Sequence, residues 1–198
     1  MISGAEVRIN GQPLDAKLQG RLIEVRVQDN LRLPDSALIR ISDPGLESVD
    51  SIPLEIGANV EILLAAVDAK SLTSVFTGRI TSLEPEFSSL GTILAARAYD
   101  GSHLLHQTKR AQTFQNMTAG DIAKKVAQRA GISVGTVESA GPPHDFVQQN
   151  NETDWEFLWR LATRIDFEVL VLQDKLVFRK AGAPGEGSEI RLRWGEEL

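Results

Sequence analysis

The sequence predicts an α+β fold that is mainly β, and three observations support this prediction. Short segments of alternating apolar and polar residues recur through residues 1–100, without a helical stripe. After Asp100-Gly101 the apolar period changes from about two to about 3.6 residues. Residues 181–188 hold three Gly and one Pro and precede a last alternating segment. We therefore expect a small antiparallel β-barrel in residues 1–100, a smaller α+β domain in residues 101–180, and a linker with the first strand of an incomplete second barrel in residues 181–198.

Strands are expected where apolar residues alternate between turn signals. Several of these segments place arginine between apolar residues, as in Val25-Arg26-Val27 and Ile39-Arg40-Ile41, which predicts one buried and one charged face. Asn10-Gly11 is typical of a tight hairpin turn. The predicted strands cover residues 6–10, 22–28, 37–42, 60–67, 75–83 and 92–99.

Two helices are expected in the second part of the chain, each with a start signal. Thr118 precedes the carboxylate of Asp121 by three residues, and the apolar stripe that follows ends at Gly131. Thr153 and Glu156 have the spacing of a capping box, which opens a helix through Ile165. Residues 167–172 and 176–179 then predict a β-hairpin.

Composition excludes several classes of protein. The 198 residues are 42% hydrophobic and 24% charged, which is typical of a globular protein. No cysteine is present, so disulfide scaffolds, thiolate metal sites and cysteine nucleophiles are excluded. The net charge is −6, with nine basic against fourteen acidic residues in 1–100 and twelve against thirteen in 101–198, which disfavours nucleic-acid recognition. The apolar runs are far shorter than the ~20 residues that span a bilayer, so no membrane span is expected.

No residue pattern predicts an enzyme. His103 and His106 have helical spacing for a metal pair, but no third ligand follows with suitable spacing. Asp100, Ser102 and His103 are the residue types of a hydrolytic triad, yet sequence neighbours cannot form the required relay. Glu84 and Glu86 flank Pro85 and are expected to be solvated rather than to act as an acid–base pair. We therefore predict no catalytic residues, no metal and no cofactor.

Four residues are candidates for contacts with a partner: Trp155, Trp159, Arg26 and Arg40. The two tryptophans are four residues apart on a predicted helix and share a face. Such a pair is more often packed in a core or against a neighbouring subunit, and the alternative is a stacking platform for sugars. The two arginines lie on the charged face of predicted strands.

An ordered set of short landmarks runs along nearly the whole chain. They are Leu33-Pro34-Asp35, Ile41-Ser42-Asp43-Pro44, Phe76-Thr77-Gly78, Glu84-Pro85-Glu86-Phe87, Tyr99-Asp100-Gly101-Ser102-His103, Asn116-Met117-Thr118, Asp121-Ile122-Ala123, and Gln148-Gln149-Asn150-Asn151. In this order and spacing the chain resembles the phage late control D and VgrG family, the baseplate hub and spike proteins of contractile tails and injection systems.

The resemblance implies a structural hub. Residues 1–100 would be a tail-tube-like barrel, and three copies with two barrels each would match the sixfold ring of the tail tube above a threefold spike. The implied partners are two further copies in a homotrimer, the tail tube ring, other baseplate and spike-tip proteins, and a cargo or effector. Assembly would take place in the bacterial cytoplasm, and the product would join a phage tail or a particle released from the cell. The alternative is a tail component that binds or hydrolyses peptidoglycan.

Overall fold

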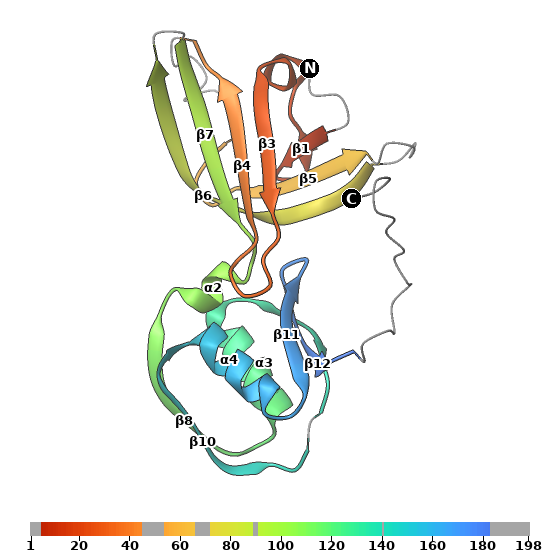
Figure 1. Ribbon diagram of the computed structural model, residues 1–198, viewed down its shortest axis with the longest axis vertical. Coiled ribbons are helices and arrows are strands. Elements are labelled where there is room, and N and C mark those ends of the chain that lie inside the picture. The colour runs from red at the N-terminus through yellow and green to blue at the C-terminus, as the bar shows by residue number, and fades with distance from the viewer. Residues whose placement is uncertain (1–4, 45–53, 66–71, 89–90, 140, 183–198) are drawn as a thin grey trace, which may run out of the picture.

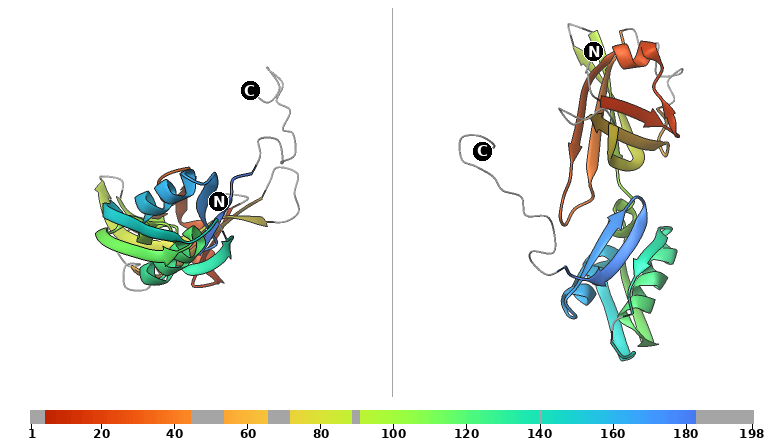
Figure 2. Two further views of the ribbon diagram at one scale, coloured as in Figure 1. Left: turned by 90° about the horizontal axis from the view of Figure 1, so that it is seen from below. Right: turned by 90° about the vertical axis from the view of Figure 1, so that its right-hand side faces the viewer.

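The computed structural model describes residues 5–44, 54–65, 72–88, 91–139 and 141–182. They form two units joined by a short linker at Asp100: a curved antiparallel sheet, and an α+β unit in which two helices are packed between strands (Figures 1 and 2). The expected end of the linker and the strand in residues 189–194 lie outside the described residues.

The first unit is a seven-stranded sheet in the order β2-β1-β5-β6-β7-β4-β3, with every neighbouring pair antiparallel. Its elements are β1 (Ala5–Ile9), β2 (Gln12–Pro13), α1 (Ala16–Gly20), β3 (Leu22–Gln28), β4 (Ser36–Ser42), β5 (Asn59–Ala65), β6 (Leu72–Ser88) and β7 (Gly91–Tyr99). The six predicted strands are present, and the Asn10-Gly11 turn joins β1 to β2 as expected, with both residues at positive φ.

Curvature of this sheet is concentrated in β6, which pairs with β7 over one part of its length and with β5 over another. The register shifts in both ladders, between Ile80 and Ser82 and opposite Ile62 and Leu63, and such bulges bend a strand. Gly78 lies near the bend, where a Cβ would collide with the carbonyl oxygen of Tyr99. As a result β1 and β5 run across β3 and β4 and enclose a core (Figure 1).

The predicted barrel is not closed by strand pairing. The edge strands β2 and β3 are not paired with one another within the described part of the chain. The short helix α1, which the sequence did not predict, follows β2, and Leu14 and Leu18 at this position join the core of the sheet. Asp15 accepts a hydrogen bond from the Leu18 backbone N–H (2.7 Å) and caps this helix. The sheet is therefore open, with a helix beside it in place of a closing ladder.

The second unit places two helices between a two-stranded ribbon and a three-stranded sheet (Figure 1). The ribbon pairs β8 with β10, and the sheet has the order β11-β12-β9, with β9 parallel to β12. Its elements are α2 (His103–His106), β8 (Lys109–Met117), α3 (Ala119–Ala130), β9 (Ser133–Val137), β10 (His144–Thr153), α4 (Asp154–Thr163), β11 (Phe167–Leu172) and β12 (Lys175–Lys180).

Both predicted helices are confirmed, together with their caps. Thr118 accepts a hydrogen bond from the Asp121 N–H, and α3 ends at Gly131 in the left-handed region (φ 78°). Thr153 and Glu156 form the expected capping box of α4. The β11–β12 hairpin is also confirmed. Strands β8, β9 and β10 were not predicted, because most of their side chains are exposed and the strands lack a buried alternating face.

Each unit has its own hydrophobic core. One core contains residues between Val7 and Ala98, and the other contains residues between Leu105 and Phe178. The expected division at residue 100 stays a prediction, and these two separate cores are what supports it.

Candidate assembly surfaces

The outer face of the sheet carries a ladder of paired charges. Arg26 Nη2 lies 2.6 Å from Glu24 Oε1 on β3, and Arg40 on β4 pairs with Glu24 Oε2 (3.4 Å) and with Glu86 on β6. Arg97 on β7 pairs with Glu84 (3.2 Å). On β4, buried residues alternate with partly exposed residues that point to this face, as the Val-Arg and Ile-Arg patterns predicted. The ladder joins the strands on one side of the sheet and balances its own charge.

This arrangement places the two arginine candidates in different situations. The Arg26 side chain is 60% exposed and remains open to a partner beside its pairing with Glu24. Arg40 is 27% exposed and bridges two carboxylates of its own sheet. Glu84 is ion-paired with Arg97 on the neighbouring strand β7, and Glu86 is ion-paired with Arg40 on β4, across β7. Both are held in structural ion pairs rather than as a pair of free carboxylates. A contact role for Arg26 and Arg40 stays a prediction.

The two tryptophans do not form a shared platform. Trp155 is 8% exposed, belongs to the core of the second unit and stacks on His106 at 5.2 Å between ring centroids. Trp159 is 40% exposed, and the Arg32 guanidinium lies 4.9 Å from its ring centroid. The spacing therefore reflects packing at Trp155, whereas Trp159 holds the β3–β4 loop (residues 29–35) against the second unit.

The residue types of a triad come together without a relay. Ser102 Oγ donates to Asp100 Oδ1 (2.7 Å), so the hydroxyl points to the acid and no histidine lies between them. His103 stacks on Tyr99 at 5.0 Å instead. Burial lowers the pKa of His106, because it disfavours the charged form of the ring that stacks on Trp155. Within the described ranges, no group of three or more metal-ligating side chains could hold a metal ion.

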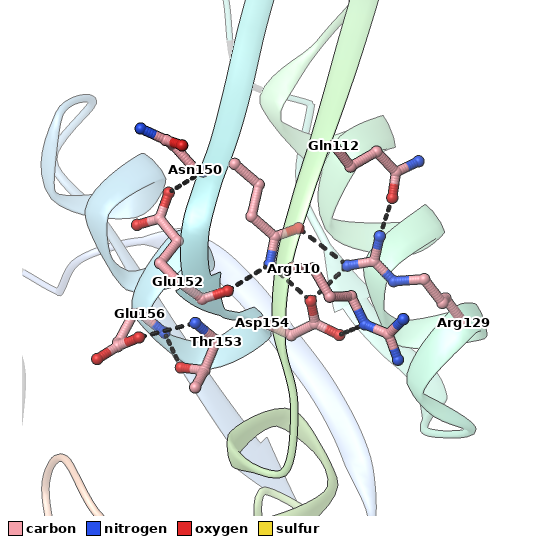
Figure 3. Close-up of polar contacts among 9 residues, drawn as sticks. Arg110, Gln112, Arg129, Asn150, Glu152, Thr153, Asp154 and Glu156 are labelled. Atoms are coloured by element: carbon pink, nitrogen blue, oxygen red, sulfur yellow. Dashed lines mark hydrogen bonds and ion pairs between the residues drawn. The ribbon is translucent and has the colours of Figure 1, made fainter.

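A buried polar network links the ribbon to both helices (Figure 3). Asp154 at the start of α4 is 3% exposed and accepts from Arg129 of α3 and from Gln149 Nε2 (2.8 Å). Arg129 also donates to Gln112 on β8 and to Gln149 on β10 (3.1 Å). Arg110 on β8 lies 3.8 Å from the other Asp154 oxygen. This network fixes the position of the ribbon. No local sequence pattern predicts it, because its members lie on four separate elements.

The junction between the units gathers residues that sequence reasoning missed. The Asp100 N–H donates to the carbonyl of Asp35 in the β3–β4 loop (3.0 Å). A Cβ on Gly101 would lie 2.7 Å from Asp174 Oδ1 of the β11–β12 turn, so glycine permits a close approach there. One feature of the sequence could have indicated this junction: Leu31 and Leu33 lie in the same loop as Asp29 and Asp35. Loops run over the protein surface and often carry function, so two leucines in a loop suggest a contact. No helix that the structure describes has the length and apolar character to cross a membrane.

The comparisons with known proteins agree with this architecture. A probable baseplate hub protein of Escherichia phage P2 is 27% identical over 88% of the chain, and that of phage 186 is 28% identical over 88%. The chain spans 44% of the length of each of these relatives.

Solved structures show the same fold at lower identity. The 43 kDa tail protein of prophage MuSo2 from Shewanella oneidensis matches with a TM-score of 0.69 and 17% identity, over 90% of this chain and 54% of that one. A tail protein from Neisseria meningitidis matches with a TM-score of 0.61 and 20% identity, over 88% and 50%. An Escherichia coli component of the type VI secretion system matches with a TM-score of 0.52 and 18% identity, over 87% and 47%. The phage tail baseplate hub (GPD) family model matches residues 50–188, most of the chain and parts of both units, and the chain therefore belongs to that family of structural hub proteins.

Proposed function

We propose that this chain is the tube-facing part of a trimeric baseplate hub that joins a hexameric tail tube to a puncturing spike. The observation that carries the proposal is the open, curved sheet in a member of the hub family. One face of this sheet is its own core, and its outer face is a self-balanced charge ladder. Two sheets of this shape in each of three subunits would present six similar units to a sixfold ring.

Among the described strands, β3 pairs only with β4 and is an edge of the sheet. This supports the proposal, because an edge strand carries unpaired backbone donors and acceptors that another chain can pair with. Ile23 on this strand is a large apolar residue that is 45% exposed, and Glu24 and Arg26 of the charge ladder follow it. We infer that β3 contacts a neighbouring subunit, and that Arg26 lies at the rim of this contact. The division at residue 100 and assembly in the bacterial cytoplasm belong to the same proposal.

The experiment is co-expression of the chain with the tail tube protein of the same particle, followed by light scattering and negative-stain imaging. We expect particles with threefold symmetry that contain both proteins. Ile23→Glu should abolish their formation, because it places a negative charge in the β3 contact. The matched control is Phe146→Glu, which changes a 59% exposed apolar side chain on the ribbon of the second unit. Monomers in every sample, or an equal loss with both variants, would contradict the proposal.

A further inference from the structure

Two adjoining hollows lie between the β3–β4 loop and the β11 strand. Their volumes are about 230 Å³ and 520 Å³, and Asp29, Asp35, Asp100, Val171 and Leu172 line both of them. We call this combined feature the junction hollow. It is open to solvent where the two units meet, and both units contribute to its walls.

One part of the junction hollow is apolar. Leu31 and Leu33 of the β3–β4 loop are 83% and 65% exposed, and Leu172 is 52% exposed. Arg32, between the two leucines, is held over the Trp159 ring. The loop is thus anchored at its centre while its leucines remain exposed, which leaves apolar area available for burial by another molecule.

The other part is acidic and lacks a counter-charge. Burial, together with the charge of Asp35, raises the pKa of Asp100 to about 6, although hydrogen bonds from Ser102 and Asp35 act to lower it. Burial likewise raises the pKa of Asp35, followed by the charge of Asp29. No Lys, Arg or His is among the described residues that line the two hollows. Asp100 also lines a neighbouring hollow together with Arg79 and His103, and neither of these two residues is among the causes of its pKa shift.

We propose that the junction hollow docks a protruding segment of a neighbouring tail protein in which an apolar side chain stands next to an arginine or lysine. The apolar side chain would pack between Leu33 and Leu172, and the cation would pair with Asp35 and Asp100. The inference deepens the proposed hub role and rests on it for the source of the segment.

We propose a different protein, rather than a second copy of this chain, as the occupant of the hollow, because the strand arginines of this chain are already paired. On the described strands, the arginines that stand between two apolar residues are Arg8, Arg26, Arg40 and Arg97, and each is paired with a carboxylate of its own sheet. A second copy would have to break such a pair to place one of these strand arginines in the hollow, and this costs part of the free energy gained. A partner with an unpaired cation has no such cost.

The test uses a capped six-residue peptide in which two leucines alternate with two arginines, titrated into the ¹⁵N-labelled chain at pH 7.5. We expect chemical shift changes confined to Leu33, Asp100, Leu172 and their neighbours. The control peptide has citrulline in place of arginine, which keeps the shape and removes the charge. It should bind about fivefold more weakly, the effect of one exposed ion pair. At pH 5 the difference between the peptides should shrink, because Asp100 is then mostly neutral.

Variants of the chain identify the site. The double variant Asp35→Asn and Asp100→Asn should bind the arginine peptide as weakly as the citrulline peptide, and Leu172→Ser should weaken both. Asp145→Asn, an exposed carboxylate of the ribbon, is the matched control and should change neither. The amide spectrum of each variant shows whether it is folded.

Three results would overturn the proposal: equal binding of the two peptides, shift changes outside the junction hollow, or no binding at millimolar peptide. Concentration-dependent shifts of the same residues without peptide would overturn it in favour of a second copy as the occupant. None of these results bears on trimer formation or tube binding, so a failure here is distinguishable from a failure of the hub role.

Discussion

The two units of this chain use charged residues in opposite ways. On the sheet, the Arg40 and Arg97 pairs lie on the outer face and join different strands, and β3 is an edge strand among the residues that the structure describes. In the second unit, Asp154 is buried and holds the ribbon against both helices. A surface ladder contributes little to stability and suits a face that meets solvent or another subunit, whereas a buried network makes a unit rigid. From this difference we expect the sheet to depend on assembly more than the second unit does.

The largest expected effect tests whether the two cores are independent. Phe157 is fully buried in the second core, and Phe157→Ala should lower the free energy of unfolding of that unit by about 3 to 5 kcal/mol. Amide hydrogen exchange should then rise in α3 and α4 and stay unchanged in β4 and β7. Ile39→Ala, in the first core, should give the reverse pattern. Loss of protection in both units from either change would show one cooperative structure instead.

The second largest effect on stability is expected from a change in the buried network. Asp154→Ala leaves Arg129 and Gln149 without their shared acceptor, and it should cost about 3 kcal/mol of unfolding free energy. Urea unfolding followed by tryptophan fluorescence measures this, because Trp155 and Trp159 lie in the second unit. The matched control is Glu168→Ala, which removes the partner of the half-exposed Arg179 and should cost less than about 1 kcal/mol. If the two variants lose the same stability, the network does not make the second unit rigid.

At the junction, the expected effect is a pH dependence. The folded state raises the pKa of Asp100 to about 6, mainly by burial, so the folded chain binds this proton more tightly than the unfolded chain. Ionised Asp100 therefore destabilises the fold above about pH 6, and this penalty disappears as the pH falls from about 7 towards 4.

Asp100→Asn keeps an acceptor for Ser102 and removes the charge. It should stabilise the chain by about 1 kcal/mol at pH 7.5, after allowance for solvent screening of a partly exposed group, and by almost nothing at pH 4. Urea midpoints at the two pH values measure the difference. If the variant is less stable than the parent at pH 7.5, interactions in the folded chain stabilise the ionised carboxylate of Asp100, and the expected penalty does not exist.

The smallest effect is expected on the charge ladder. Arg40→Gln removes the bridge between Glu24 and Glu86, and the urea midpoint should fall only slightly in low salt. In 1 M salt, where the screening length is about 3 Å, the difference from the parent should vanish. A large loss of stability that persists in high salt would mean that the ladder stabilises the sheet as strongly as the buried network stabilises the second unit. The two units would then not differ in how they use charge.

Local signals predicted most of the elements that bury one face or begin with a cap. The alternation around Arg26 and Arg40 identified β3 and β4, and Thr118 and Thr153 identified the starts of both helices. The ribbon was missed because β8 and β10 bury little more than Phe114, Val147 and Gln149, and no period is visible in strands with two polar faces.

The candidate sites were harder to predict because they depend on long-range contacts. Arg32 meets Trp159, and Arg129 meets Asp154, from elements that no local pattern connects. Trp155 and Trp159 were predicted to share a helical face, with packing favoured over a stacking platform, and the structure places one in the core and the other under Arg32. Spacing on a helix gives the face of a side chain, while the neighbouring element decides whether that face is buried.

The most direct test of the contrast between the units is amide hydrogen exchange of the chain alone and in the assembled tail. We expect the amides of β3 to exchange rapidly in the isolated chain and to slow at least tenfold, about 1.4 kcal/mol, on assembly, while the amides of α3 and α4 remain slow in both states. Equal exchange of β3 in the two states would contradict this expectation, because the open edge of the sheet would then have no partner in the tail.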